Sequence, residues 1–281
     1  MALALNGCAT TNNGTALAQM ERDAPLKLLV MQSPMTVDAR RLQAVLAPDS
    51  KRRLSLSDAA IAQGVEHAEQ HAQAAMQFAL GGRSGLALVA APERDKAFIE
   101  NLAARSLGES LSRDEANRIA ADTGADAVLR FCMTDYGVTP RAWRDAYIAF
   151  EVTSTLAIAG AIAYSGSAVA GTAAGAYLAQ ETVEETAEAY AGFWGLNVVS
   201  RPVRMTAELV RLDPVATVWE DGRTGLSDVQ LSRLTRRVGP RETDRQLDGS
   251  TTDAAGELVS DLSAALASSV AVRPPAERDW R

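Results

Sequence analysis

Hydrophobic and polar positions follow two different rhythms along this chain of 281 residues. Three short apolar runs that end at Pro or at a polar exit predict strands, at residues 26–31, 86–90 and 125–136. At 203–211 apolar residues alternate with Arg, Thr and Glu, which predicts a fourth strand with one exposed face. Asp213-Pro214 is a turn signal before residues 216–219, so we expect an antiparallel hairpin.

Elsewhere the apolar residues recur every three or four positions, which predicts helices. A long helix begins at the cap Ser57-Asp58 and ends at Gly81-Gly82, and a second covers 94–107. Ser112 and Glu115 have the spacing of a capping box, which opens a short helix ending at Gly124. Residues 221–250 are polar and predict an irregular loop. Thr252-Asp253 then predicts the cap of a last amphipathic helix.

A long Ala- and Gly-rich segment, residues 141–196, separates the third and fourth predicted strands and predicts a helical insertion. Its centre, 152–179, has no charged residue and exceeds the roughly 20 residues that span a bilayer. The small residues Gly160, Gly171 and Gly175 allow close helix contacts with a membrane-embedded or neighbouring helix. Three interpretations stay open: a helical hairpin against the domain or a second subunit, a segment that enters or touches a membrane, and a flexible loop.

The order of these elements predicts an α/β (α+β) fold, with a mixed sheet of about five strands covered by helices and the helical insertion between the third and fourth strands. We expect the chain to divide into a tether, two parts of one α/β domain that flank the insertion, and a disordered tail. The boundaries are 1–23, 24–140, 141–196, 197–270 and 271–281.

Composition narrows the class of protein. Nearly half of the residues are apolar, which is enough for a sizeable core. The net charge of −7 argues against a nucleic-acid partner, which would require a concentrated basic surface. The two cysteines are Cys8 and Cys132, and Cys132 lies in an apolar run where we expect it to be buried as part of the core.

The segment Leu5-Asn6-Gly7-Cys8 resembles a bacterial lipobox, although Asn6 departs from the usual pattern. The resemblance implies that Cys8 carries a diacylglyceryl thioether and an acylated amino terminus. Because Ala9 rather than Asp follows the cysteine, it also implies sorting to the outer membrane, facing the periplasm. Only seven residues precede Cys8, fewer than an export signal needs, so we expect the true start of the chain to lie upstream.

Three further segments carry a resemblance to envelope lipoproteins: Gly124 to Leu129, the exit Tyr136-Gly137, and Val218-Trp219-Glu220. Over roughly residues 26–266 the chain resembles the curli secretion channel lipoprotein and the N-terminal domain of the Tol translocation protein. It departs from them at the last hairpin, where Asp213-Pro214-Val215 replaces Thr-Gly. The resemblance implies a periplasmic α/β domain used for protein contact or assembly, and it implies no catalytic residues.

Candidate chemistry outside the lipobox is sparse. His67 and His71 lie one turn apart and could clamp a metal, but the metalloprotease pattern needs Glu directly after the first His, and we expect both rings to face solvent. Gly81 to Gly85 precedes a strand, whereas a phosphate loop follows one. Asp126 and Asp135 flank a strand and are more readily explained as strand ends than as a catalytic pair.

Basic residues concentrate in the loop that precedes the last predicted helix. They are the arginines at 223, 233, 236, 237, 241 and 245. Such a loop could meet anionic lipid or an acidic partner, although a solvated loop is the simpler interpretation.

These observations favour a non-enzymatic, lipid-anchored periplasmic protein that acts as a binding or assembly component of an envelope complex. We expect no cofactor, no nucleic acid and no metal, the lipid bilayer as a partner through Cys8, and a homo-oligomer as one form of assembly. One alternative is an oligomeric pore-forming or secretion-channel subunit in which 152–179 enters the membrane. A second is a metal-dependent enzyme that uses His67 and His71.

Overall fold

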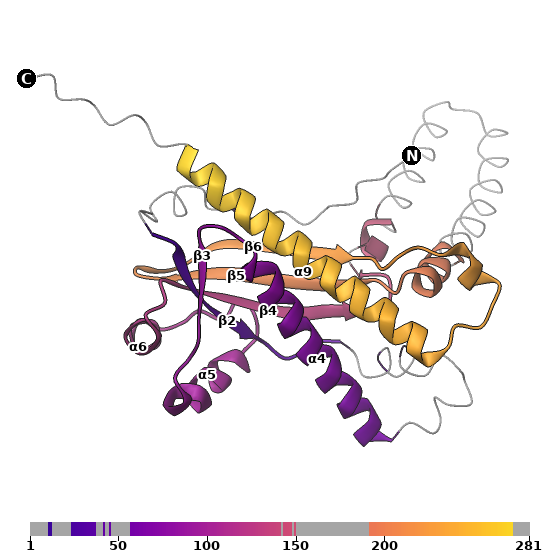
Figure 1. Cartoon of the computed structure of the whole chain (residues 1–281), viewed down its shortest axis with the longest axis horizontal. Helices are drawn as coiled ribbons and strands as arrows, with labels where there is room; N and C mark the ends of the chain where they lie inside the picture. The colour runs from indigo at the N-terminus through magenta and orange to yellow at the C-terminus, as the bar shows by residue number, and fades with distance from the viewer. Residues whose placement is uncertain are drawn as a thin grey trace, which may run out of the picture.

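A mixed sheet lies at the centre of the protein in its computed structural model (Figure 1). The structure describes residues 11–12, 24–37, 42, 45, 57–141, 143–147, 149 and 191–271. The strand order is β1-β6-β5-β4-β2-β3. The strands are β1 (Thr11–Asn12), β2 (Leu26–Gln32), β3 (Leu86–Val89), β4 (Ala127–Tyr136), β5 (Val203–Leu212) and β6 (Val215–Gly225). β2 pairs parallel with β3 and β4, and the remaining pairs are antiparallel. The predicted mixed sheet of five strands is confirmed, with the two-residue β1 added at one edge.

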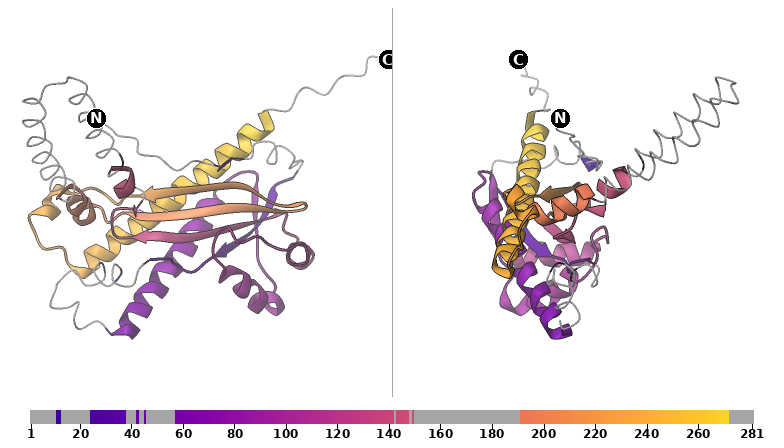
Figure 2. Two further views of the ribbon diagram at one scale, coloured as in Figure 1. Left: turned by 180° about the vertical axis from the view of Figure 1, so that it is seen from behind. Right: turned by 90° about the vertical axis from the view of Figure 1, so that its right-hand side faces the viewer.

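Helices cover both faces of this sheet. They are α4 (Asp58–Gly81), α5 (Lys96–Ala103), α6 (Arg113–Thr123) and α9 (Pro240–Ala271), with short 3-10 turns η1 (Glu93–Asp95) and η2 (Leu231–Leu234). α4 and α9 lie on one face of the sheet. Figure 1 shows these two helices in front of the strands, and the left view of Figure 2, from the opposite side, shows the strands in front of the helices. α5 and α6 pack on the other face through a second, smaller apolar cluster. The result is a sheet between two helical layers.

The main core follows from the alternation of side chains along β5. Met205, Ala207 and Leu209 point to the α4/α9 face and belong to one buried cluster with residues of both helices, such as Met76 and Leu258. At the end of β6 the backbone itself touches α9. A β-carbon on Gly225 would overlap the carbonyl oxygen of Ser250 and the amide nitrogen of Ala254. Only glycine therefore allows this strand and helix to pack so closely.

The predicted capping box opens α6. The Ser112 hydroxyl accepts a hydrogen bond from the Glu115 amide, and the Glu115 carboxylate accepts one from the Ser112 amide. The same carboxylate forms an ion pair with Arg105, which follows α5. The hydrogen bonds from Arg105, followed by the one from the Ser112 amide, lower the pKa of Glu115 to about 2. Sequence spacing predicted the cap, but the pairing with Arg105 requires the turn between α5 and α6.

Substitution of Glu115 tests this arrangement. The folded-state pKa lies below the unfolded value of about 4.3, so the ionised carboxylate stabilises the fold above about pH 4 and this contribution is lost as pH falls towards 2. Glu115→Gln retains a capping oxygen but loses the ion pair, and we expect it to cost about 1 kcal/mol at pH 7. Urea unfolding at pH 7 and pH 2.5 should show the difference shrinking at the lower pH. A constant difference would contradict this account.

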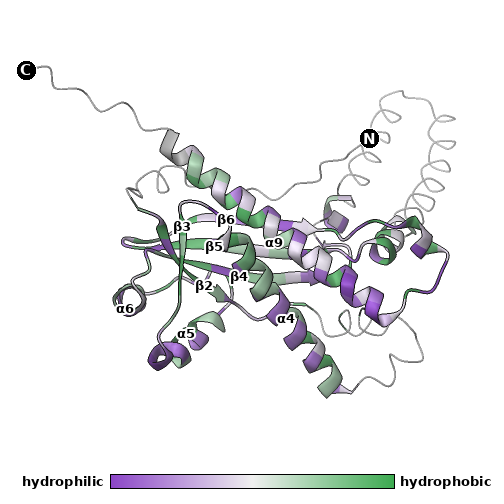
Figure 3. Cartoon of the chain, viewed as in Figure 1, coloured by the Kyte–Doolittle hydropathy of each residue, from purple (hydrophilic) through white to green (hydrophobic). Residues whose placement is uncertain are grey.

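Two sequence predictions about the C-terminal part are wrong. β5 is buried almost throughout rather than half-exposed, because both of its faces are covered. Residues 221–250 are not an irregular loop: β6 extends to Gly225, and α9 begins at Pro240 and runs past Thr252-Asp253 without a cap there. The N-terminal part of α9 is hydrophilic (Figure 3), yet it buries polar side chains that form hydrogen bonds, so apolar periodicity does not reveal it.

The insertion between β4 and β5 is described only at its two ends, which are helical at 141, 143–147, 149 and 191–199. The residues Cys8, Gly160, Gly171 and Gly175, and the whole of the segment 152–179, lie outside the described residues. Among the helices that the structure describes, none combines the length and the apolarity needed to cross a membrane.

Candidate binding surface at one end of the sheet

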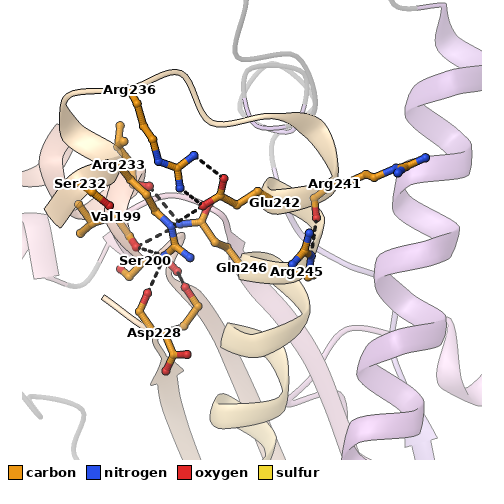
Figure 4. A network of polar contacts seen from close by, with 12 residues as sticks. Val199, Ser200, Asp228, Ser232, Arg233, Arg236, Arg241, Glu242, Arg245 and Gln246 are labelled. Atoms are coloured by element: carbon orange, nitrogen blue, oxygen red, sulfur yellow. Dashed lines mark hydrogen bonds and ion pairs between the residues drawn. The ribbon is translucent and has the colours of Figure 1, made fainter. Parts of the chain in front are cut away.

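A buried arginine organises the loop between β6 and α9 (Figure 4). Arg233, in η2, is only 7% exposed. Its guanidinium donates hydrogen bonds to the carbonyl oxygens of Val199, at 2.7 Å, and Asp228, at 2.6 Å. It also pairs with Glu242 at 3.0 Å, and Arg236 binds both oxygens of the same carboxylate. These bonds hold the loop against α9 and against the helical segment 191–199.

The Glu242 carboxylate is the centre of this arrangement. Hydrogen bonds from Arg236, and then from Arg233, lower the pKa of Glu242 to about 2. Gln246, one turn later on α9, donates through Nε2 to the carbonyl oxygens of Val198 and Val199, each at 3.1 Å. The loop and the helix 191–199 are thus joined to α9 through the same few polar side chains.

Although the loop is held firmly, it leaves apolar side chains facing water. Their exposed fractions are 52% for Trp194, 57% for Val229, 71% for Leu231 and 39% for Leu234. A β-carbon added to Gly195 would contact Leu234 Cδ2 at 3.7 Å, so the helix that carries Trp194 lies beside η2. We call Trp194, Val229, Leu231 and Leu234 the apolar end patch. Adjoining apolar side chains exposed together are typical of an interaction site, whereas single ones are common on any surface.

Next to the patch is a polar recess of about 900 Å³, between the loop and α9. Its wall includes Asp228, Arg233, Glu242, Arg245, Gln246 and Asp253. The Asp253 carboxylate accepts a hydrogen bond of 2.9 Å from the Leu226 amide, and this bond joins the end of β6 to α9. Gln246 Oε1 is buried and accepts no hydrogen bond from the part of the chain that the structure describes. A wall with charges of both signs suits water or a small polar solute rather than an apolar ligand.

The arginines that the sequence grouped together have different roles. Arg223 belongs to β6 and pairs with Asp221 at 3.1 Å and with Asp261, and Arg233 is buried. The other four, at 236, 237, 241 and 245, are exposed. From Leu226 to Arg245 there are five arginines and three acids, so this stretch carries 5 − 3 = +2, in a chain whose net charge is −7. The local basic character predicted from the sequence rests on this smaller set, in which four of the five arginines are exposed.

The two histidines do not both face solvent as expected. His71 is half-buried against α9, with Nε2 at 3.1 Å from the Asp248 carbonyl oxygen and 3.3 Å from Thr252 Oγ1. Because that hydroxyl donates to the same carbonyl, we assign Nε2 of His71 as the donor. His67 and His71 each lie about 4 Å from the Asp248 carboxylate. The prediction failed because α9 begins earlier than expected and its first turns pack on α4.

No metal centre is present among the described residues, in the sense that no group of three or more His, Cys, Asp or Glu there has the geometry to hold an ion. Asp126 and Asp135 lie at opposite ends of β4. The Asp126 carboxylate accepts a hydrogen bond from the Lys27 amide, and the Asp135 carboxylate accepts one from the Arg141 amide. Gly81 to Gly85 forms the turn from α4 into β3.

The other face of the sheet holds a buried ion pair that sequence reasoning missed. Arg130 of β4 and Glu208 of β5 are opposite each other and contact at 2.8 Å, and both are almost completely buried. Arg130 also donates to the carbonyl oxygens of Arg105, Ser106 and Glu109, and the Gly108 amide donates to Glu208. The pair therefore fixes the turn between α5 and α6 to the sheet. Its one sequence signal is a charged residue in the middle of an apolar strand.

Two further polar groups of the sheet region are buried. Cys132 lies in the core as predicted, 3.4 Å from Thr206 Oγ1, and burial raises the pKa of its thiol. Arg201, before β5, is 8% exposed and has a φ of 51°. Within the described ranges it forms no hydrogen bond or ion pair, and burial lowers its pKa. Burial of a charged group without a partner is costly.

Comparisons with known proteins assign no family. The sequence matches no family model and no curated protein. Among solved structures, the chain is similar to a PelC dodecamer from Paraburkholderia phytofirmans, with 12% sequence identity over 85% of this chain and 89% of that one. The TM-score of 0.29 is too low to establish that the two share a fold.

Proposed function

We propose that this protein is held to the outer membrane by a lipid on Cys8 and acts, without catalysis, as a binding or assembly component on the periplasmic side. The observation that carries the proposal is the lipobox-like segment Leu5-Asn6-Gly7-Cys8. The geometry supports an interaction role, because the buried Arg233 network fixes a loop that presents apolar side chains to the surroundings. Rigid loops that expose such residues are typical of binding surfaces.

Intact-mass analysis tests the anchor. The chain would be expressed in a bacterium from an upstream-extended start, together with the matched variant Cys8→Ser. We expect a mature form that begins at Cys8, carries added lipid mass and fractionates with the outer membrane, because a thioether-linked diacylglycerol buries many methylene groups. We expect Cys8→Ser to lose both the lipid mass and the membrane association after salt washing. An unprocessed wild-type chain would contradict the proposed anchor.

A further inference from the structure

The apolar end patch is built into the fold rather than left over from it. The Arg233 guanidinium donates hydrogen bonds to two backbone carbonyls, those of Val199 and Asp228, and to the Glu242 carboxylate. Its bonds fix the backbone immediately before Val229, while Val229 and Leu231 remain more than half exposed. A loop free to rearrange would turn these side chains inward, so the network maintains their exposure.

The stretch that carries three of the four patch residues has a charge opposite in sign to that of the whole chain. The stretch Leu226 to Arg245 carries +2 in a chain of −7, and its exposed cations are all arginines. Arginine binds phosphate oxygens through paired N–H donors. Tryptophan and leucine next to arginine are the residue types that amphipathic surfaces place at the boundary between lipid head groups and acyl chains.

We propose that the apolar end patch docks onto the surface of an anionic lipid bilayer, with Trp194 and Leu231 at head-group depth and the exposed arginines 241 and 245 against lipid phosphates. The proposal deepens the proposed function by naming what this surface contacts. Docking would orient the domain on the membrane to which Cys8 tethers it.

The test uses the full chain with Cys8→Ser, so that it does not depend on the lipid anchor. Sedimentation with vesicles of phosphatidylglycerol and phosphatidylcholine at 1:3 would be compared with vesicles of phosphatidylcholine alone. We expect binding to the anionic vesicles that weakens as salt is raised. In Trp194→Ala with Leu231→Ala, we expect binding about tenfold weaker or more, because two buried apolar side chains are lost. The matched control is Phe78→Ala, which removes a side chain that is 83% exposed on α4.

Charge variants separate the electrostatic contribution. Arg241→Gln with Arg245→Gln should weaken binding to anionic vesicles about threefold to tenfold and leave binding at high salt unchanged. The control pair Arg83→Gln with Arg113→Gln removes two exposed arginines outside this region and should have no comparable effect. Circular dichroism would confirm that each variant is folded.

A fluorescence measurement tests insertion directly. With Trp143 and Trp280 replaced by Phe, the remaining tryptophans are Trp194 and the fully buried Trp219. Brominated lipids should quench Trp194, and Trp194→Phe should abolish that quenching. The proposal is overturned if the folded wild-type protein does not bind anionic vesicles, or if Phe78→Ala weakens binding as much as the patch variant does. It is also overturned if the patch variant binds vesicles as the wild type does and changes only the oligomeric state measured without lipid. The last result would identify the patch as an interface between copies, while a failure of Cys8 lipidation alone would leave the docking result intact.

Discussion

We expect Glu208→Leu to lower the free energy of unfolding by about 3–5 kcal/mol, because it leaves the Arg130 guanidinium buried without its counter-charge. Burial raises the pKa of Glu208 while the adjacent Arg130 opposes that rise, so the carboxylate depends on its partner. The Gly108 amide would also lose its acceptor. Urea unfolding followed by circular dichroism at pH 7 would measure the loss.

The double variant Arg130→Met with Glu208→Leu is the control. Removing both charges leaves apolar side chains of similar volume, and such replacements often restore stability or exceed it. Here Arg130 also holds the carbonyl oxygens of Ser106 and Glu109, so we expect recovery of part of the loss. If the stability lost in the double variant equals the sum of the losses in Glu208→Leu alone and in Arg130→Met alone, the two residues act independently.

We expect Gly225→Ala to destabilise the fold by about 3 kcal/mol, because the new methyl group has no space between β6 and α9. The atoms that it would overlap, Ser250 O and Ala254 N, belong to the backbone of a helix and cannot rotate away as a side chain could. The strand and the helix must separate to accept it. Thermal and urea unfolding would measure the change, and an unchanged midpoint would contradict the close packing described here.

Gly256→Ala provides the matched control in α9. A β-carbon there meets no atom within 4 Å, and the residue lies in the helix interior. Alanine has a higher helix propensity than glycine, so we expect this change to stabilise the protein by about 0.5–1 kcal/mol. Opposite signs for the same substitution at positions 225 and 256 would separate packing from helix propensity.

Much of the fold could be predicted from local signals. Ser57 and Ser112 cap helices because their hydroxyls accept backbone amides three residues ahead, which is a local interaction that spacing reveals. Short apolar runs between turn residues located β2, β3 and β4. The alternation along β5 correctly indicated a strand, but it could not show that Arg204 and Glu208 would be covered, since their burial depends on distant segments.

The start of α9 escaped prediction for a related reason. Gln246, Ser250 and Thr251 are buried, and each donates a side-chain hydrogen bond to a backbone carbonyl. Two of those carbonyls belong to Val199 and Ser200, about 50 residues earlier in the chain. A helix that buries polar side chains lacks the apolar periodicity from which the other helices were recognised.

The candidate surface was only partly predictable. Sequence reasoning located its arginines but treated them as one solvated group, because nothing local shows that Arg233 is buried while Arg236 is exposed. Leu231 stands in a polar stretch and gave no signal of its own. Trp194 comes from the end of the insertion, so its place beside η2 depends on the antiparallel return of the chain into β5.

That return has a consequence for how the protein can change over evolution. Tyr136 and Val203 are paired across β4 and β5, so the chain leaves the sheet and re-enters it at neighbouring positions. The entropic cost of closing such an excursion rises only by about 0.6 kcal/mol for each doubling of its length. Insertions and deletions within 150–190 can therefore accumulate without altering strand register. Homologues are expected to keep the sheet and to diverge most in this segment, where a new partner specificity can arise at little risk to folding.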